Sequence, residues 1–227
     1  MIIGLDGDDT LWHSERGFAD AQAVFRALLL EYAPEPVTDQ TLLATERRNL
    51  EVFGYGVKAF VLSMIETALE VSDARITGAE MKRIVEIGRA LLEHPIELID
   101  GVEDTVAELA TCHRLVLITK GDLHHQETKV AASGLADHFW RIEIVTEKDV
   151  ATYQRVLDRH GIPPGEFVMV GNSVRSDILP VLDIGSRAVH VPYEITWEIE
   201  HAAVDDADLF PTITSLRELP DLVRDWR

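Results

Sequence analysis

The stretch Ile2-Ile3-Gly4-Leu5-Asp6-Gly7-Asp8-Asp9-Thr10 joins a short apolar run to a cluster of carboxylates. Such a run predicts a short buried strand, and open α/β sheets bind ligands beyond the carboxyl ends of their strands. Asp6 and Asp8 are two residues apart, so their charges repel, and a hard cation such as Mg²⁺ would relieve that repulsion. The alternative is a plain polar turn, because Asp and Gly are common turn residues.

The residues that follow, from about 15 to 94, show helical periodicity and no strand pattern. Prolines 34 and 36 and glycines 54 and 56 divide them, and Thr77-Gly78-Ala79-Glu80 has the form of a capping box. We expect helices over about 15–32, 38–52, 58–70 and 77–94. Together they predict a small helical bundle.

From about residue 100 the pattern changes to short apolar runs separated by helical segments, which is typical of parallel βαβ units. The fold class expected is therefore α/β, with a doubly wound, Rossmann-like parallel-sheet core at 1–14 and 96–227. The inserted helical domain, 15–95, follows the acidic turn directly, so we expect it to cover the strand ends as a cap. The expected strands are 115–118, 142–145, 167–170 and 188–191, with a possible short one at 208–210. The expected helices between them are 102–111, 122–133, 149–160 and 175–183.

The composition limits the partners and the compartment. The 227 residues are 46% hydrophobic and carry a formal net charge of −19, which argues against nucleic acid and anionic membrane surfaces. An acidic chain can still bind phosphate through local cations. The single cysteine, Cys112, permits no internal disulfide, and we see neither a signal peptide nor an apolar stretch long enough to span a bilayer. A cytoplasmic location is expected.

Three further features fall at the ends of expected strands. Thr119-Lys120-Gly121 offers a hydroxyl, backbone amides and a lysine, which suit an anion. Lys148 supplies a compact positive charge, and the segment Gly171-Asn172-Ser173-Val174-Arg175-Ser176-Asp177 supplies two oxygen ligands, Asn172 and Asp177. Taken singly, each feature also has a plain structural explanation: a helix cap for Thr119 and for residues 171–177, and a solvent-facing side chain for Lys120 and Lys148.

Taken together, these features make the chain resemble the haloacid dehalogenase-like (HAD) hydrolase superfamily over nearly its whole length. Asp6-x-Asp8-x-Thr10 matches the nucleophile motif, Thr119 the hydroxyl motif and Lys148 the lysine motif. The acidic motif is matched by residues 171 to 177. A helical insertion between the first two motifs resembles the C1-type cap of the family's small-metabolite phosphatases.

The resemblance implies a Mg²⁺-dependent phosphatase acting on a small phosphorylated metabolite. Asp6 would attack phosphorus and form an aspartyl-phosphate, and Asp8 would serve as general acid and base. The expected metal ligands are Asp6, the backbone carbonyl of Asp8, and Asn172 or Asp177. The expected phosphoryl ligands are Thr119, Lys148, and the amides of Lys120 and Gly121. The leaving group and the oligomeric state stay open.

One residue departs from the family pattern, because Asn172 stands where the family usually has Asp. Asn172 supports a rival hypothesis, in which the chain is a 2-haloacid dehalogenase. These members of the family need no metal, attack carbon and resemble this chain in having Asn at this position. They lack the second Asp, so Asp8 favours the phosphatase. A phosphomutase and a non-enzymatic binding protein on a HAD scaffold are weaker alternatives.

Overall fold

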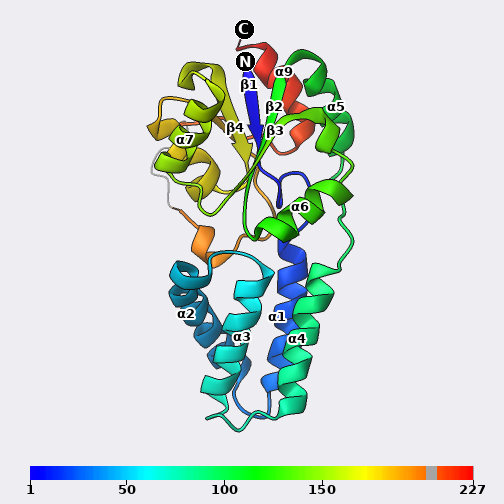
Figure 1. The fold of residues 1–227 in the computed structure, drawn as a ribbon, viewed down its shortest axis with the longest axis vertical. Helices are drawn as coiled ribbons and strands as arrows, with labels where there is room; N and C mark the ends of the chain where they lie inside the picture. Colours follow the sequence, from blue (N-terminus) through cyan, green and yellow to red (C-terminus); the bar gives the residue numbers. More distant parts are fainter. Residues whose placement is uncertain (203–208, 227) are drawn as a thin grey trace. The chain divides into compact units, whose positions relative to one another are not determined.

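A computed structural model describes residues 1–202 and 209–226, and these contain a parallel five-stranded sheet with flanking helices. The strand order is β3-β2-β1-β4-β5, which places the first strand at the centre (Figure 1). The expected α/β fold class is confirmed. The strands are β1 (Ile2–Leu5), β2 (Arg114–Lys120), β3 (Phe139–Val145), β4 (Phe167–Gly171) and β5 (Arg187–His190).

The described helices fall where the periodicity expects them, with one addition near the end of the chain. The four helices of the insertion are α1 (Glu15–Leu29), α2 (Glu35–Phe53), α3 (Val57–Val71) and α4 (Gly78–Leu92). Those of the sheet domain are α5 (Val102–Cys112), α6 (Leu123–Ala132), α7 (Val150–His160), α8 (Leu179–Asp183) and α9 (Leu219–Arg224). A π-helical turn, η3 (Val174–Ile178), precedes α8, and a 3₁₀ turn, η4 (Glu198–Glu200), follows β5.

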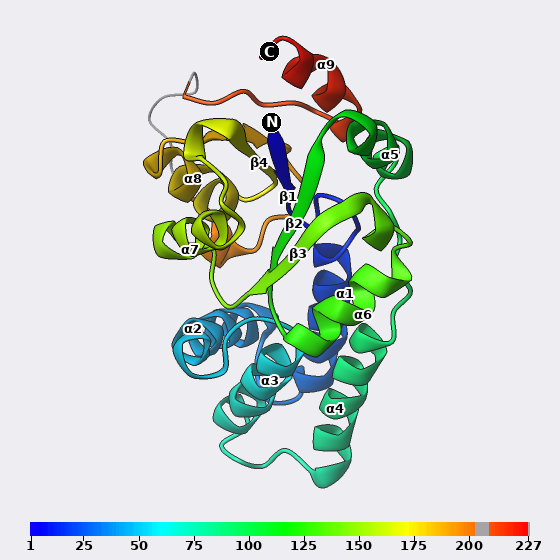
Figure 2. The same cartoon turned by 45° about the horizontal axis from the view of Figure 1, so that its top comes forward.

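Both faces of the sheet are covered, which explains why the neighbouring strands β1 and β4 are entirely apolar. Successive strand residues point to opposite faces, so Leu117 of β2 packs in one buried cluster and Ile118 in another. The first cluster includes residues of α5 and α9, and the second includes residues of α7 and α8. Figure 2 shows these two pairs of helices flanking the strands.

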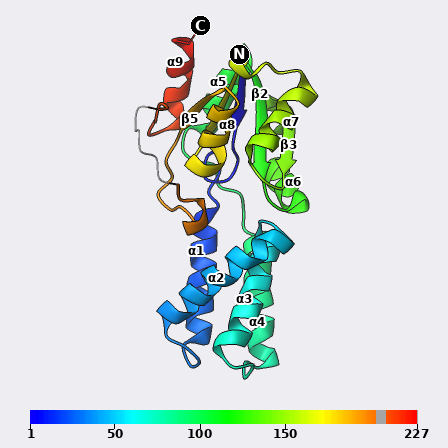
Figure 3. The same ribbon diagram turned by 90° about the vertical axis from the view of Figure 1, so that its left-hand side faces the viewer.

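The chain divides into two compact units, residues 1–15 with 96–227, and residues 16–95. Figure 3 shows the four helices of the second unit. They share a core of their own, to which each contributes, including Phe25, Leu42, Phe60 and Ile84. The Thr77 capping box is present at the start of α4. Assignment of the two units as catalytic core and cap stays a prediction.

The two connections to the insertion are joined to each other inside the first unit. Trp12 and Leu98 form an antiparallel bridge. His13 N donates to the Glu97 carbonyl and Ile99 N donates to the Leu11 carbonyl, both at 3.0 Å. The chain therefore leaves and re-enters the sheet domain at neighbouring points.

Some boundaries differ from the expectation. Proline does not delay α2 to residue 38, because Pro34 is its N-cap residue and Pro36 lies in its first turn, where no amide partner is lost. The short helix α9 was not expected. The possible strand at 208–210 begins at Asp208, outside the described residues, and Leu209 and Phe210 form a bend.

Candidate active site

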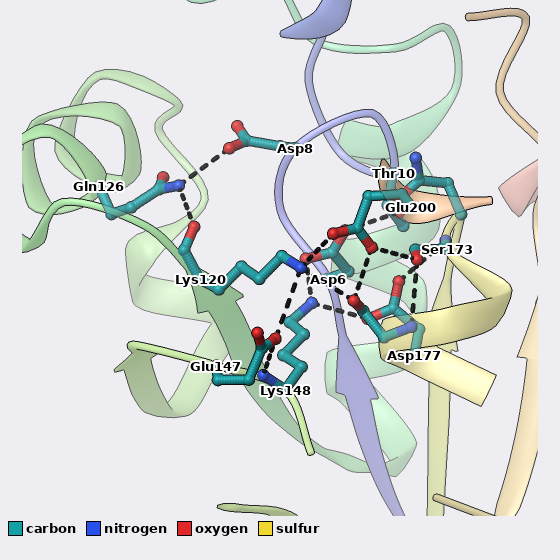
Figure 4. A network of polar contacts seen from close by, with 12 residues as sticks. Asp6, Asp8, Thr10, Lys120, Gln126, Glu147, Lys148, Ser173, Asp177 and Glu200 are labelled. Carbon is teal, nitrogen blue, oxygen red and sulfur yellow. Dashed lines mark hydrogen bonds and ion pairs between the residues drawn. The ribbon is translucent and has the colours of Figure 1, made fainter. Parts of the chain in front are cut away.

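The carboxyl ends of neighbouring strands bring most of the expected site residues together. Asp6 follows β1, Thr119 is near the end of β2, and Asp177 lies in the turn after β4. Lys148 comes from the loop between β3 and α7 and reaches the Asp6 carboxylate. Figure 4 shows this network, with the Asp8 carboxylate directed toward Gln126 instead.

The tight turn after β1 fixes Asp6. The Gly7 carbonyl accepts from the amides of Thr10, Leu11 and Trp12 at 2.8–3.3 Å. A Cβ on Gly7 would lie 2.7 Å from the Trp12 ring, so no larger residue fits without movement. The Thr10 hydroxyl donates to Oδ2 of Asp6 at 3.3 Å, so Thr10 helps to organise the turn.

Lys148 lies between two carboxylates. Its ammonium donates to Oδ1 of Asp6 and, at 2.7 Å, to Oδ1 of Asp177. The side chains are almost fully buried, with exposed fractions of 2% for Lys148, 8% for Asp6 and 1% for Asp177. Burial opposes the charge on Lys148, but the Asp177 and Asp6 carboxylates raise its pKa.

The pKa of Asp6 is raised to about 7. Burial is the main cause, and the Asp177 charge adds to it, whereas the Lys148 ammonium acts in the opposite direction. Two carboxylates share one ammonium here, so the cluster holds a surplus of negative charge when both are ionised. Such a surplus favours the binding of a further cation.

The turn after β4 is built closely around Asp177. A Cβ on Gly171 would lie 2.3 Å from Cγ of Asp177, so glycine is required for this approach. Oδ2 of Asp177 accepts from the Ser173 amide at 3.0 Å. Oδ1 of Asn172 lies 3.5 Å from the Thr10 hydroxyl, which itself contacts Asp6.

Thr119 presents a buried hydroxyl to the turn after β1. Its Oγ1 has no hydrogen-bond partner within the described part of the chain, and it lies 3.2 Å from where a Cβ on Gly7 would be. A buried hydroxyl without a partner is costly unless a ligand satisfies it. The Gly121 amide departs from the expected phosphate-binding role, because it donates to the Val145 carbonyl at 3.3 Å.

The Asp8 carboxylate is hydrogen-bonded to side chains of α6 and of its own turn. Its carboxylate accepts from Lys129 at 2.7 Å, from Gln126 at 2.9 Å and from the Trp12 ring nitrogen at 2.6 Å. Burial opposes ionisation, but the Lys129 ammonium and these hydrogen bonds lower the pKa of Asp8 overall. In this arrangement Asp8 is an ionised carboxylate, which suits a base better than an acid.

Reasoning from sequence missed three residues of this network: Gln126, Lys129 and Glu200. Glu200 accepts from the side chains of Lys120, Ser173 and Ser176. Gln126 and Lys129 lie on α6 three residues apart, a spacing that puts them on one helix face but names no partner. Nothing in the pattern around Glu200 connects it to residues that precede it by more than twenty positions.

The donor set fits a hard cation. Among residues 1–202 and 209–226, no three His, Cys, Asp or Glu side chains are grouped so that they could hold a metal. The available donors are the oxygens of Asp6 and Asp177, the Asn172 amide oxygen and backbone carbonyls of the same turns. Oxygen donors of this kind suit Mg²⁺, and the surplus negative charge around Lys148 agrees with it.

Comparison with known proteins identifies the family. The model of the haloacid dehalogenase-like hydrolases matches residues 1–185. A haloacid dehalogenase-like family hydrolase from Xanthomonas campestris has a similar structure, with 48% identity, a TM-score of 0.90, and coverage of 99% of this chain and 91% of that one. In the part of the chain that the structure describes, no helix is long and apolar enough to cross a membrane.

The chain is also similar over part of its length to a phosphatase and, in fold, to a dehalogenase. The N-acylneuraminate-9-phosphatase of Mus musculus is 33% identical over 102 residues, which is 43% of this chain. The match spans only 41% of that relative's length. A 2-haloacid dehalogenase from Pseudomonas syringae shares the fold, with a TM-score of 0.66 and 24% identity over 100% of this chain and 99% of that one.

Proposed function

Because the chain belongs to the haloacid dehalogenase-like hydrolases, we propose that it is a Mg²⁺-dependent phosphatase of small phosphomonoesters. The observation that carries the proposal is the buried Asp6 carboxylate, paired with Lys148. The unpartnered Thr119 hydroxyl nearby supports it. The similarity to a phosphatase over part of the chain agrees with this choice. The substrate would be a phosphorylated metabolite, and the location cytoplasmic.

In the proposed reaction, an oxygen of Asp6 attacks phosphorus and the bond from phosphorus to the ester oxygen breaks. Asp6 then carries the phosphoryl group as an aspartyl-phosphate. Lys148, the Thr119 hydroxyl and the Lys120 amide hold the phosphoryl oxygens. The Lys148 ammonium favours the ionised form of Asp6, which a nucleophilic carboxylate requires, and so opposes the effect of burial.

Asp8 moves protons in this proposal. Away from Lys129 it takes up a proton from solvent and gives it to the departing ester oxygen. It later takes a proton from the water that attacks the aspartyl-phosphate, which breaks the bond from phosphorus to Asp6 and releases phosphate. To do so its side chain must leave Gln126 and Lys129 and turn toward Asp6. The hydrogen bonds to α6 therefore describe a resting position of Asp8.

Asp6, the Asp8 carbonyl, Asn172 and Asp177 would hold Mg²⁺, which supplies charge screening between the nucleophile and the phosphoryl oxygens. Asn172 is neutral, so this site has one charge fewer than with Asp at the same position. Asp177 therefore carries more of the attraction. We therefore expect weaker Mg²⁺ binding than in a relative with Asp at this position.

A second candidate is dehalogenation of a 2-haloacid, with Asp6 attacking carbon and a halide leaving. Two observations favour it: Asn172 in place of Asp, and an Asp8 carboxylate that points away from Asp6 (Figure 4). The presence of Asp8 itself argues against it, because a departing halide needs no proton.

The deciding experiment measures phosphate release from p-nitrophenyl phosphate and a panel of small phosphate esters, with Mg²⁺ and with EDTA. The Asp6→Asn variant is the blank. We expect Mg²⁺-dependent release that falls at least about a thousandfold in the variant, as expected when a nucleophile is removed. Chloride release from 2-haloacids with no phosphate release would instead establish the dehalogenase.

A further inference from the structure

Glu200 is a buried carboxylate that the proposed reaction does not use. Its side chain is 12% exposed and belongs to η4, beyond the residues matched by the family model. Oε1 accepts from the Lys120 ammonium at 2.5 Å. Oε2 accepts from the hydroxyls of Ser173 and Ser176, both at 2.6 Å. Three donors therefore converge on one carboxylate.

The surroundings keep Glu200 ionised and Lys120 occupied. Burial opposes ionisation, but the Lys120 ammonium and the serine hydroxyls lower the pKa of Glu200 to about 2. Lys120 also donates to the Ser176 hydroxyl at 2.9 Å and lies 3.7 Å from Glu147. The Lys120 ammonium thus binds groups of the protein itself, whereas its backbone amide follows Thr119 directly in the chain.

The donors to Glu200 come from two different strand ends. Lys120 ends β2, directly after Thr119. Ser173 and Ser176 lie in the turn after β4, where the Ser173 amide also donates to Asp177 (Figure 4). The strand between them in the sheet, β1, carries Asp6. Glu200 therefore connects the two turns on either side of the nucleophile.

We propose that Glu200 is a positioning residue of the candidate active site, which aligns the turns after β2 and β4 by binding Lys120, Ser173 and Ser176. This inference rests on the proposed function of that site. Misplacement of catalytic groups by about 1 Å can cost about a hundredfold in rate. Glu200 would act on alignment rather than on the reacting atoms.

The test is a double-mutant cycle with Glu200→Gln, Lys120→Met and the combined variant. The Gln side chain keeps the shape and removes the charge. Glu143→Gln is the matched control, because Glu143 is also 12% exposed and paired, with Arg159 and His160, but lies on the edge strand β3. Each variant is assayed with the best phosphate ester of the panel, and its unfolding midpoint and its Kd for inorganic phosphate are measured.

We expect Glu200→Gln to lower kcat by about 10- to 100-fold. KM and the Kd for phosphate should stay within about threefold of the wild type, because ground-state binding is retained. The combined variant should be no worse than the poorer single variant, because both remove the same connection. Glu143→Gln should keep wild-type kcat.

The outcomes separate the two proposals. If the wild type neither hydrolyses an ester nor binds phosphate, the proposed function fails, and the role of Glu200 fails with it. If the wild type is active and Glu200→Gln keeps more than half of its kcat, only the role of Glu200 fails. If the losses in kcat of the two single variants multiply in the combined variant, Glu200 does not act through Lys120, and the proposal is overturned. If Glu200→Gln unfolds, Glu200→Asp replaces it, and recovery of kcat beyond Glu200→Ala at equal stability supports the proposal.

Discussion

The proposed reaction requires Asp6 to be ionised, but the folded protein disfavours this form. Its pKa in the folded protein is about 7, against an ordinary value of 3.8. A carboxyl group with a raised pKa binds its proton more tightly in the folded state. Its contribution to stability is therefore complete below pH 3.8 and is lost as the pH rises through about 7.

We accordingly predict that Asp6→Asn gains stability over the wild type as the pH rises from about 4 to about 7, measured in EDTA. The gain is at most roughly 4 kcal/mol, since one pKa unit is worth about 1.4 kcal/mol. Unfolding by urea at a series of pH values gives the difference. Asp149→Asn is the control, because hydrogen bonds from Thr152 lower the pKa of Asp149, so its difference from the wild type should change mainly below about pH 4. A difference for Asp6→Asn that shrinks with rising pH would contradict this prediction.

At the same scale, the strand-end rule was sufficient to place Asp6, Thr119 and Asp177 at the same edge of the sheet. The rule also puts Lys148 at this edge, but its ion pairs with Asp6 and Asp177 were not predicted. The position of the Asp8 side chain did not follow, because Lys129 and Gln126 compete for it through tertiary contacts. Glu200 was missed for the same reason, since an irregular segment carries no periodic signal.

Among the elements, α6 has a role beyond covering the sheet, because Lys129 is buried with its ammonium against Asp8. The exposed fractions are 7% for Lys129 and 29% for Asp8. Removing one partner of a largely buried pair leaves the other charge poorly compensated. The pair therefore ties the helix to the turn that carries the proposed acid and base.

We predict that Lys129→Met lowers the free energy of unfolding by about 2 kcal/mol, a value reduced from that of a fully buried pair because Asp8 is partly exposed. Chemical denaturation measures it. The control is Lys82→Met, which removes an exposed pair with Glu86 and should cost less than about 0.5 kcal/mol. If both substitutions lower the free energy of unfolding equally, the pair with Asp8 contributes no more than an exposed pair, which would contradict the prediction.

Element boundaries show where local signals are reliable. The Thr77 and Glu80 side chains start α4 as a capping box, as expected, because the cap is made within four residues. Pro34 and Pro36, at the start of α2, were misjudged as a longer interruption, although proline is well tolerated in a first turn. The short α9 was missed because its burial on the sheet, through Leu219 and Val223, depends on distant partners.

For the molecule as a whole, the periodicity was enough to predict parallel βαβ units but not the strand order. Only tertiary packing puts β1 between β2 and β4, and this order determines which turns meet. Within the proposed function, the oxygens of two such turns, those after β1 and β4, are the basis of Mg²⁺ binding. Binding to the folded state alone must then appear as added stability of the entire chain.

We predict that Mg²⁺ raises the unfolding midpoint, and that the rise is larger for Asn172→Asp, which adds a carboxylate to the donors. Stabilisation reaches about 2.7 kcal/mol when the free ion is at 100 times its Kd. Scanning calorimetry with and without Mg²⁺ measures the shift, and Asp177→Asn should abolish it. An equal or smaller shift in Asn172→Asp would contradict the assigned donors.

The pairing of residues 11–13 with 97–99 has a consequence for how such a protein can change over time. Hydrogen bonds of the sheet domain hold both ends of the insertion together. The length of the insertion therefore has little effect on the stability of that domain. Doubling a loop costs only about 0.6 kcal/mol in closure entropy. A recombination event could therefore exchange residues 16–95 for an unrelated module and leave the Asp6–Lys148–Asp177 cluster intact.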